Sequence, residues 1–333
     1  MVNALRVGVL GAGYIAAAHV GAYASTSGVE LVVIADPAPG KAERLARRVG
    51  ARSCTNVDEL FEAGLDAVSV CTPSPTHGDL AVRALDAGLH VLCEKPIARN
   101  VAEAERIIAA EKSSISTLMI GHVSRFEPDH ARAQQVVAAG RLGDLHLMKQ
   151  SITSGKPTWS EDAWLDDPAQ SGGPVVDLAI HSFDYLAWVN RSQPIRITAN
   201  AVDTNAGPAT YALITLRYAN GAVGVVETSW AHPASHGFAV STELAGASGR
   251  LSWDYAGLQS GAINTSSGRT AVEPLGSRGF VAEIAAFVDA IRMGKPSPVS
   301  ASEGLAALRT SLAALESIRT GVPVEMPLDA DDV

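Results

Sequence analysis

The feature that most constrains the fold is the alternation of short apolar runs with helix-length segments over the first 121 residues. Apolar runs of strand length lie at 5–10, 31–35, 66–71, 89–93 and 117–120. Helical segments follow some of these runs, at 76–87 and 101–112 among others. Strands that alternate with helices of this kind form a parallel sheet with right-handed crossovers. The pattern therefore predicts an α/β N-terminal half built on a doubly wound parallel sheet, in which ligands bind at the carboxyl ends of the strands.

A glycine-rich segment joins the first strand to the first helix and reads Gly-Ala-Gly-Tyr-Ile-Ala. Gly11 allows a tight turn, and Gly13 allows the backbone to approach a pyrophosphate closely. The N–H groups at the N-terminus of the following helix are available to phosphate oxygens, and we expect Tyr14 and Ile15 of this segment to contact the cofactor as well. Alone, a G-x-G-x-x-A motif is a weak signal, but after a strand and before a helix it predicts a Rossmann dinucleotide site.

Asp36 stands at the carboxyl end of the second predicted strand. An acidic residue at this position accepts hydrogen bonds from an adenosine ribose and repels a 2′-phosphate. Lys41 and Arg44 lie close enough along the chain to keep NADP open as an alternative. We therefore expect NAD as the cofactor in preference to NADP.

Polar residues also follow the two strands predicted at 66–71 and 89–93. Because these strand ends belong to the expected cofactor crevice, we expect five residues to contact the cofactor, namely Thr72, Pro73, His77, Glu94 and Lys95. A lysine at a strand end is often only solvated, so the position of Lys95 leaves both a functional and a purely structural role open.

The second half of the chain has a different pattern, and we place the domain boundary between residues 121 and 122. Alternating strands at 211–217, 223–230, 238–244 and 250–255 are joined by tight turns, of which Asn220-Gly221 is a strong hairpin signal. Helices are expected at 279–293 and 302–319. Residues 122–333 therefore predict an α+β domain with a large open, mostly antiparallel sheet, for substrate binding and oligomerisation.

One helix of this domain, beginning near Pro174, is apolar almost all round. Asp177, His181 and Asp184 interrupt it at i, i+4 and i+7, so they share one stripe of the helix. Buried charges are costly unless they are paired or open onto a polar cavity. The stripe is therefore either a self-satisfied Asp–His pair in the interior or an acid/base site.

Composition excludes several classes of function. The chain of 333 residues has 26 Lys and Arg against 35 Asp and Glu, a net charge of −9, without a basic cluster for nucleic acid. Residues 7–29 lack formal charges but contain too much Gly, Ser, Thr, Tyr and His for a membrane span. The three cysteines suit a reducing compartment, so we expect a cytoplasmic protein. His232 and His236 do not form a known metal motif, and we expect no metal.

Taken together, the motifs resemble those of the Gfo/Idh/MocA oxidoreductases, a family that includes glucose–fructose oxidoreductase and inositol 2-dehydrogenases. The resemblance rests on the glycine-rich opening, on Glu94-Lys95-Pro96, and on Gly172-Gly173-x-x-x-Asp177-x-x-x-His181. It implies NAD(P)-dependent oxidation or reduction of a sugar, cyclitol or related polyol, with Lys95, Asp177 and His181 as the catalytic set. It also implies a homodimer or homotetramer formed through the C-terminal sheet.

The residue types agree with that chemistry, because an imidazole such as His181 is suited to take a hydroxyl proton near neutral pH. On the substrate side we expect Asp184, Arg125 and Trp164 to contribute. Three alternatives stay open: reduction of an imine or another carbonyl on the same fold, an NAD-binding regulator without turnover, and glycoside cleavage with a retained NAD.

Overall fold

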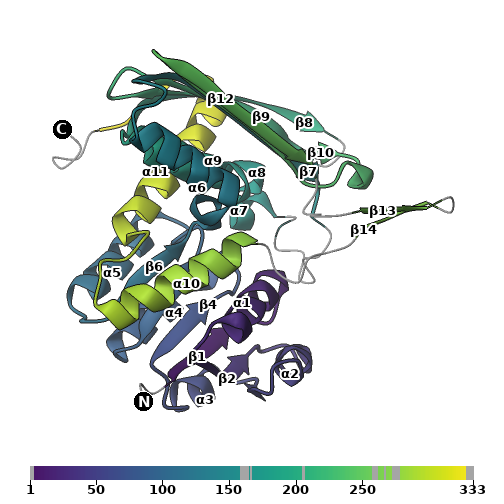
Figure 1. Ribbon diagram of the computed structural model, residues 1–333, viewed down its shortest axis with the longest axis vertical. Helices are drawn as coiled ribbons and strands as arrows, with labels where there is room; N and C mark the ends of the chain where they lie inside the picture. Colours follow the sequence, from purple (N-terminus) through teal and green to yellow (C-terminus); the bar gives the residue numbers. More distant parts are fainter. Residues whose placement is uncertain are drawn as a thin grey trace. The chain divides into compact units, whose positions relative to one another are not determined.

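The computed structural model describes residues 4–157, 165, 167–204, 207–256, 262–265, 268–271 and 278–327 (Figure 1). Internal contacts divide the chain into two units, residues 1–127 with 275–305 and residues 128–274 with 306–333. The expected single boundary assigned all of 122–333 to the second domain. The contacts instead assign 122–127 and 275–305 to the first unit, because the helix that follows residue 277 packs against the first helix of the chain.

The first unit contains a six-stranded parallel sheet in the order β3-β2-β1-β4-β5-β6. Its strands are β1 (Leu5–Leu10), β2 (Val29–Ala35), β3 (Arg52–Cys54), β4 (Ala67–Val70), β5 (His90–Glu94) and β6 (Leu118–Gly121). Its α-helices are α1 (Tyr14–Ser25), α2 (Lys41–Arg47), α3 (Val57–Phe61), α4 (His77–Asp86), α5 (Val101–Lys112) and α10 (Arg278–Met293). The strand order reverses between β1 and β4, the switch point at which doubly wound sheets bind ligands. The predicted Rossmann sheet is confirmed.

The inner strands of this sheet are mostly apolar because both faces are covered, as in other parallel sheets, whereas the edge strand β3 is polar and mostly exposed. All four residues of β4 are buried, and α1 packs against α10 while α4 packs against α5 (Figure 1). The sequence analysis anticipated the long elements but not α2, β3 and α3. These elements have three to seven residues each, too few for hydrophobic periodicity to reveal them.

The second unit contains a seven-stranded sheet in the order β12-β11-β7-β10-β9-β8-β15. Its strands are β7 (Leu145–Gly155), β8 (Pro194–Thr204), β9 (Gly207–Tyr218), β10 (Val223–His232), β11 (Ala239–Gly246), β12 (Gly249–Ala256) and β15 (Val324–Glu325). A short hairpin, β13 (Ala262–Thr265) with β14 (Gly268–Ala271), forms a separate sheet. The predicted hairpin at Asn220-Gly221 joins β9 to β10, with Gly221 at a φ of 88°. Every pairing in the seven-stranded sheet is antiparallel except β7 with β10, so the mostly antiparallel prediction is confirmed.

Helices cover one face of this sheet (Figure 1). They are α6 (Pro128–Ala138), α7 (Pro168–Ser171), α8 (Gly173–Asp177), α9 (Ala179–Asn190) and the part of α11 (Ala301–Thr320) that belongs to this unit. Along β9 the side chains alternate, with Ala212, Ile214 and Leu216 buried and Leu213, Thr215 and Arg217 exposed. This period of two places the core between the helices and one face, and leaves side chains of the other face exposed.

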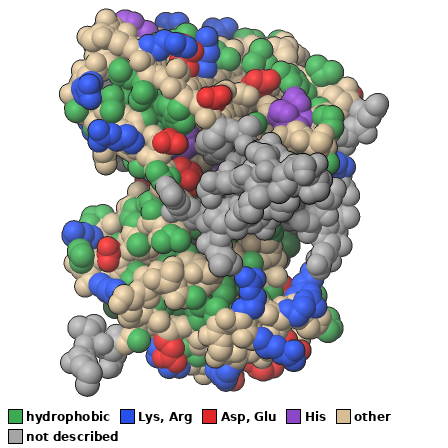
Figure 2. Space-filling view, turned by 45° about the vertical axis from the view of Figure 1, so that its right-hand side comes forward, with side chains coloured by type: hydrophobic (Ala, Val, Ile, Leu, Met, Phe, Trp, Pro, Cys, Tyr) green, Lys and Arg blue, Asp and Glu red, His purple; other side chains and the backbone are tan. Residues whose placement is uncertain are grey.

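The described surface carries both signs of charge. On the face shown in Figure 2, Lys and Arg lie among Asp, Glu and apolar side chains. Among the described residues, no helix combines the length and the apolar composition required to cross a bilayer.

Candidate active site

The glycine-rich turn after β1 has the geometry expected of a phosphate-binding loop. Gly11 has a φ of 95°, and a Cβ atom built on it would lie 2.5 Å from the carbonyl oxygen of Cys71, after β4. A Cβ on Gly13 would meet no atom of the described residues within 4 Å. In the described part of the chain no side chain forms a capping hydrogen bond at the N-terminus of α1, and Tyr14 in its first turn is 52% exposed. The turn therefore leaves open space beside the amino end of a 12-residue helix, as a pyrophosphate requires.

Asp36 follows β2 and turns its carboxylate toward this loop. Its Oδ2 accepts a hydrogen bond from the N–H of Ala12 at 2.8 Å, and its Oδ1 accepts one from the N–H of Ala38 at 2.9 Å. A carboxylate has about four lone-pair sites, so two acceptor sites remain for ribose hydroxyls. The donor set around this loop therefore fits a dinucleotide.

His77 joins the loops that follow β4 and β5. It is buried, and its Nε2 and Nδ1 lie 2.8 Å from the carbonyl oxygens of Thr72 and Pro96, respectively. Burial lowers the pKa of His77, while the two backbone hydrogen bonds oppose that shift. Thr72 is half-buried and Pro73 is exposed at the same strand end. The hydrogen bonds give His77 a role in holding the two loops together, and its contact with a cofactor stays a prediction.

Glu94 ends β5 and is buried, whereas Lys95 is half-buried. Oε1 of Glu94 lies 2.9 Å from Nε2 of His19, and its Oε2 accepts the backbone N–H of Lys95 at 3.1 Å. Although burial raises the pKa of Glu94, the hydrogen bond and charge of His19, with Lys95 and His77 nearby, bring it below its ordinary value. Glu94 is therefore a buried carboxylate that fixes the backbone presenting the Lys95 side chain.

Asp177 and His181 lie on either side of a break between two helices. The expected single helix ends at Asp177 as α8, and α9 begins at Ala179 after one interrupting residue. Gly172 precedes α8 with a φ of 69°, which favours glycine. Asp177 and His181 are both half-buried. The break places Asp177 at the end of one helix and His181 in the first turn of the next.

The three substrate-side candidates differ in their surroundings. Asp184 lies one turn beyond His181 and is only 3% exposed. Arg125 is also buried, and its Nη1 donates to Oε1 of Glu303 at 2.6 Å. Although burial raises the pKa of Glu303, Arg125 and Ser300 hold it below its ordinary value. Trp164 lies outside the described residues.

Two family models match this chain. The first, described as an oxidoreductase family with an NAD-binding Rossmann fold, matches residues 5–122. The second, described as the GFO/IDH/MocA C-terminal domain, matches residues 130–252. Inositol 2-dehydrogenase from Rhizobium meliloti (strain 1021) is 30% identical over 94% of this chain and 97% of its own length.

The chain belongs to the Gfo/Idh/MocA oxidoreductase family.

Solved structures of similar proteins extend over nearly the whole chain. GenD2 from gentamicin A biosynthesis, in complex with NAD, has a TM-score of 0.89 at 26% identity and covers 98% of both chains. A putative myo-inositol dehydrogenase from Sinorhizobium meliloti 1021 has a TM-score of 0.85 at 28% identity, with 97% of this chain and all of that one covered. The predictions of a Gfo/Idh/MocA oxidoreductase and of an NAD-binding Rossmann domain are therefore confirmed.

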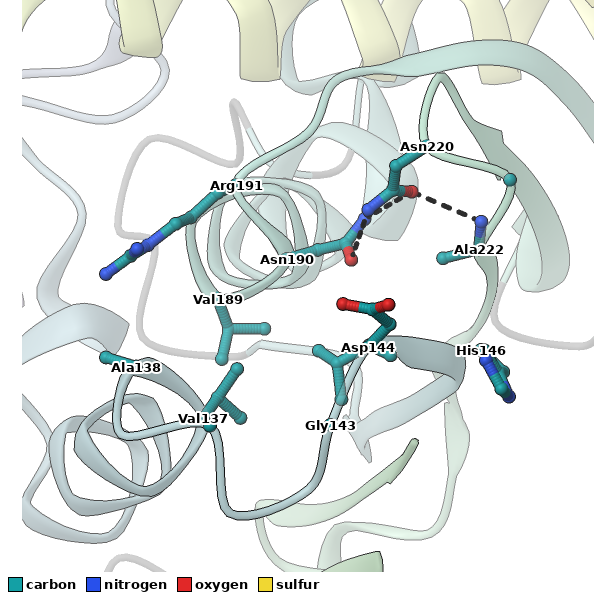
Figure 3. Close-up of a pocket in the computed structure, with 13 residues that line it drawn as sticks. Val137, Ala138, Gly143, Asp144, His146, Val189, Asn190, Arg191, Asn220 and Ala222 are labelled. Atoms are coloured by element: carbon teal, nitrogen blue, oxygen red, sulfur yellow. Dashed lines mark hydrogen bonds between the residues drawn. The ribbon is translucent and has the colours of Figure 1, made fainter. Parts of the chain in front are cut away.

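A cavity of about 660 Å³ lies in the second unit (Figure 3), and none of the predicted site residues that the structure describes is among its lining residues. It is lined by Asn190 and Arg191 at the carboxyl end of α9, among others, and Asn190 pairs there with Asn220 through two hydrogen bonds of 3.3 and 3.0 Å. His181 lies at the other end of α9, roughly 13 Å away at 1.5 Å per residue. In this Gfo/Idh/MocA protein the cavity is therefore not the candidate active site.

The sequence analysis missed two buried polar residues beside Glu94, namely His19 on α1 and Glu283 on α10. A signal was present, because both occupy apolar helical stripes. Glu283 has Phe287 and Ala290, four and seven residues further on, as buried neighbours on its stripe. By contrast, the rings of His232 and His236 stack with centroids 4.1 Å apart, and Nε2 of His236 lies 3.0 Å from Oγ1 of Thr153.

Proposed function

We propose that this protein is an NAD-dependent dehydrogenase that transfers hydride between a nicotinamide and a CH–OH carbon of a sugar, cyclitol or related polyol. The observation that carries the proposal is that this Gfo/Idh/MocA chain has a lysine, an aspartate and a histidine at the positions expected for proton transfer and for stabilising charge on the reacting oxygen. Lys95 follows the β5 strand of the Rossmann domain, and Asp177 and His181 flank the α8–α9 break. The similarity along nearly the full chain to an inositol 2-dehydrogenase supports the substrate class.

In this proposal His181 takes the substrate hydroxyl proton at a ring nitrogen, while the carbon–hydrogen bond breaks and a carbonyl forms. Bound nicotinamide supplies the hydride acceptor. Asp177 orients the imidazole and stabilises its protonated form. The Lys95 ammonium donates a hydrogen bond to the reacting oxygen and stabilises developing alkoxide charge.

Substrate contacts are assigned by position. Asp184, one turn after His181, accepts hydrogen bonds from other hydroxyls of the polyol. Arg125 and Trp164 contribute further polar and apolar contacts, and the ion pair with Glu303 fixes the orientation of Arg125. Reduction of another carbonyl or an imine is the second outcome that the same residues allow.

The cofactor preference follows from Asp36. Its carboxylate is held at the glycine-rich turn by two backbone N–H groups. A fixed negative charge there favours the ribose hydroxyls of NAD and disfavours the 2′-phosphate of NADP.

Self-association through the exposed face of the seven-stranded sheet completes the proposal. Val202 on β8 and Leu213 on β9 are 59% and 47% exposed. Exposed aliphatic side chains on a broad sheet favour pairing with a second copy of the same face.

The decisive assay follows absorbance at 340 nm with NAD, then NADP, across cyclitols, aldoses, and deoxy and amino sugars. Lys95→Ala and His181→Ala should each lower kcat by ~10²–10⁴, the contribution of a positioned acid/base group, while NAD affinity is kept. Lys112→Ala and His146→Ala, at exposed positions, are the matched controls. Normal turnover in both site variants would refute the catalytic assignment, and NAD binding without turnover on any substrate would favour a regulator.

A further inference from the structure

Glu283 on α10 is a carboxyl group enclosed in the first unit. The residue is 0% exposed, and neither carboxyl oxygen has a hydrogen-bond partner among the described residues. One of its oxygens lies within 4.8 Å of a ring nitrogen of His19 and of a carboxylate oxygen of Glu94. A buried polar group without a hydrogen bond destabilises the fold, so its presence calls for an explanation such as a functional role.

The surroundings of Glu283 favour its neutral form, whereas those of Glu94 favour its ionised form. Burial, and then the charges of Glu94 and Glu127, raise the pKa of Glu283 well above its ordinary value. His19 instead keeps Glu94 ionised through the 2.9 Å hydrogen bond. When two neighbouring carboxyl groups have environments that separate their pKa values, one is the acid and the other the carboxylate.

Glu94 lies between Glu283 and the candidate catalytic residue Lys95, because it is close to the first and hydrogen-bonded to the second. Its Oε1 contacts His19, whose Nδ1 lies 3.2 Å from Oγ of Ser69, and Tyr23 lies 2.9 Å from the same hydroxyl. Its Oε2 accepts the backbone N–H of Lys95. A second negative charge at Glu283 would repel Glu94 from the position in which it holds Lys95.

We propose that Glu283 is a positioning residue of the dehydrogenase. As a neutral acid beside the Glu94 carboxylate, it lets Glu94 keep the position in which it accepts the backbone N–H of Lys95. The inference rests on the proposed function of Lys95. Among the described residues, the other titratable groups that interact electrostatically with Glu283 are Tyr23 on α1, Cys71 after β4 and Glu127 before α6. His19, Glu94 and Glu283 are also residue types that ligate divalent cations, so a metal ion is the competing occupant.

The first test uses the full-length protein and the pH dependence of stability, which needs no substrate. A carboxyl group with a raised pKa in the folded state stabilises the fold below its unfolded pKa and loses that contribution as the pH rises. Glu283→Gln, which mimics the neutral acid, should therefore gain in Tm relative to the wild type between pH 5 and pH 8. Asp289→Asn, at an exposed position of the same helix, should differ from the wild type in Tm by the same amount at every pH. A constant difference for Glu283→Gln as well would overturn the neutral-acid assignment.

The second test measures kcat, KM and NAD affinity from pH 6 to pH 10. Glu283→Gln should keep the wild-type kcat at pH 7 and lose the alkaline fall that ionisation of Glu283 produces in the wild type. Glu283→Leu, which removes the polar group, should lower kcat roughly 10- to 100-fold, as expected when a reacting group is displaced by about an ångström. Its KM and NAD affinity should stay near wild type. Equal kcat for the Gln and Leu variants at every pH would mean that Glu283 only fills space, and would overturn the proposal.

Two further outcomes separate the competing explanations. If calorimetry shows stoichiometric Zn²⁺ binding by the wild type and none by Glu283→Gln, the cluster is a metal site and the neutral-acid assignment is overturned. Absence of turnover with any substrate, together with the expected pH-dependent stability, would refute the proposed function and the positioning role with it, while the neutral acid would stand.

Discussion

Replacing each glycine of the turn after β1 by alanine separates stability from cofactor binding. Gly11 has a φ of 95°, where an L-residue costs about 1–2 kcal/mol. Its new Cβ would also lie 2.5 Å from the backbone oxygen of Cys71, and such overpacking costs about 1–3 kcal/mol more. Gly11→Ala should therefore lower the free energy of unfolding by about 2–5 kcal/mol, which for a unit of this size lowers Tm by roughly 4–20 °C.

Gly13→Ala should have the opposite profile. Gly13 has a φ of −81°, and its new Cβ would have no described atom within 4 Å, so the free energy of unfolding should change by less than about 1 kcal/mol. The methyl group would instead occupy the space through which a phosphate reaches the N–H groups of α1. Losing one hydrogen bond to a charged phosphate costs about 1.5–3 kcal/mol, which is roughly 10- to 150-fold in Kd.

Thermal unfolding and calorimetric titration with NAD measure the two effects in the same preparations. Gly21→Ala, on the exposed side of α1 with open space around it, is the matched control and should keep both properties. Wild-type NAD affinity in Gly13→Ala would refute the placement of the pyrophosphate beside this turn. An unchanged Tm in Gly11→Ala would refute the close approach of the β1 and β4 loops.

Two other changes test the remaining proposals. Asp36→Ala should reduce the preference for NAD over NADP, because it removes the charge that repels a 2′-phosphate; the ratio of the two kcat/KM values measures this, and an unchanged ratio would remove Asp36 from cofactor selection. Leu213→Lys should shift the protein from an oligomer toward a monomer in light scattering, because it places a charge on the exposed sheet face; a monomeric wild type, or an oligomer unaffected by the change, would refute that interface.

Much of the candidate site could be predicted because its motifs are local in sequence. The turn Gly11–Gly13 and the sequence Glu94-Lys95-Pro96 each depend on residues adjacent along the chain and on the end of one strand. Parallel strands then bring their carboxyl ends to one edge of the sheet. The Asp177–His181 spacing was also visible, but the break at Leu178 was not, because the apolar pattern continues through it.

The sequence by itself determined the alternating α/β half, the hairpin-rich second half and which residue types the candidate site offers, because hydrophobic period and turn residues act over short distances. Only the tertiary structure decided which distant residues meet. Arg125 and Glu303 are 178 positions apart, and α10 brings Glu283 to Glu94 although nothing near either residue encodes the other. The parallel pairing of β7 with β10 could not be predicted for the same reason, because strand periodicity determines which face is buried but not which strand lies alongside. The charges of the buried carboxyl groups therefore come from packing, which desolvates Glu283 and gives Glu94 its histidine.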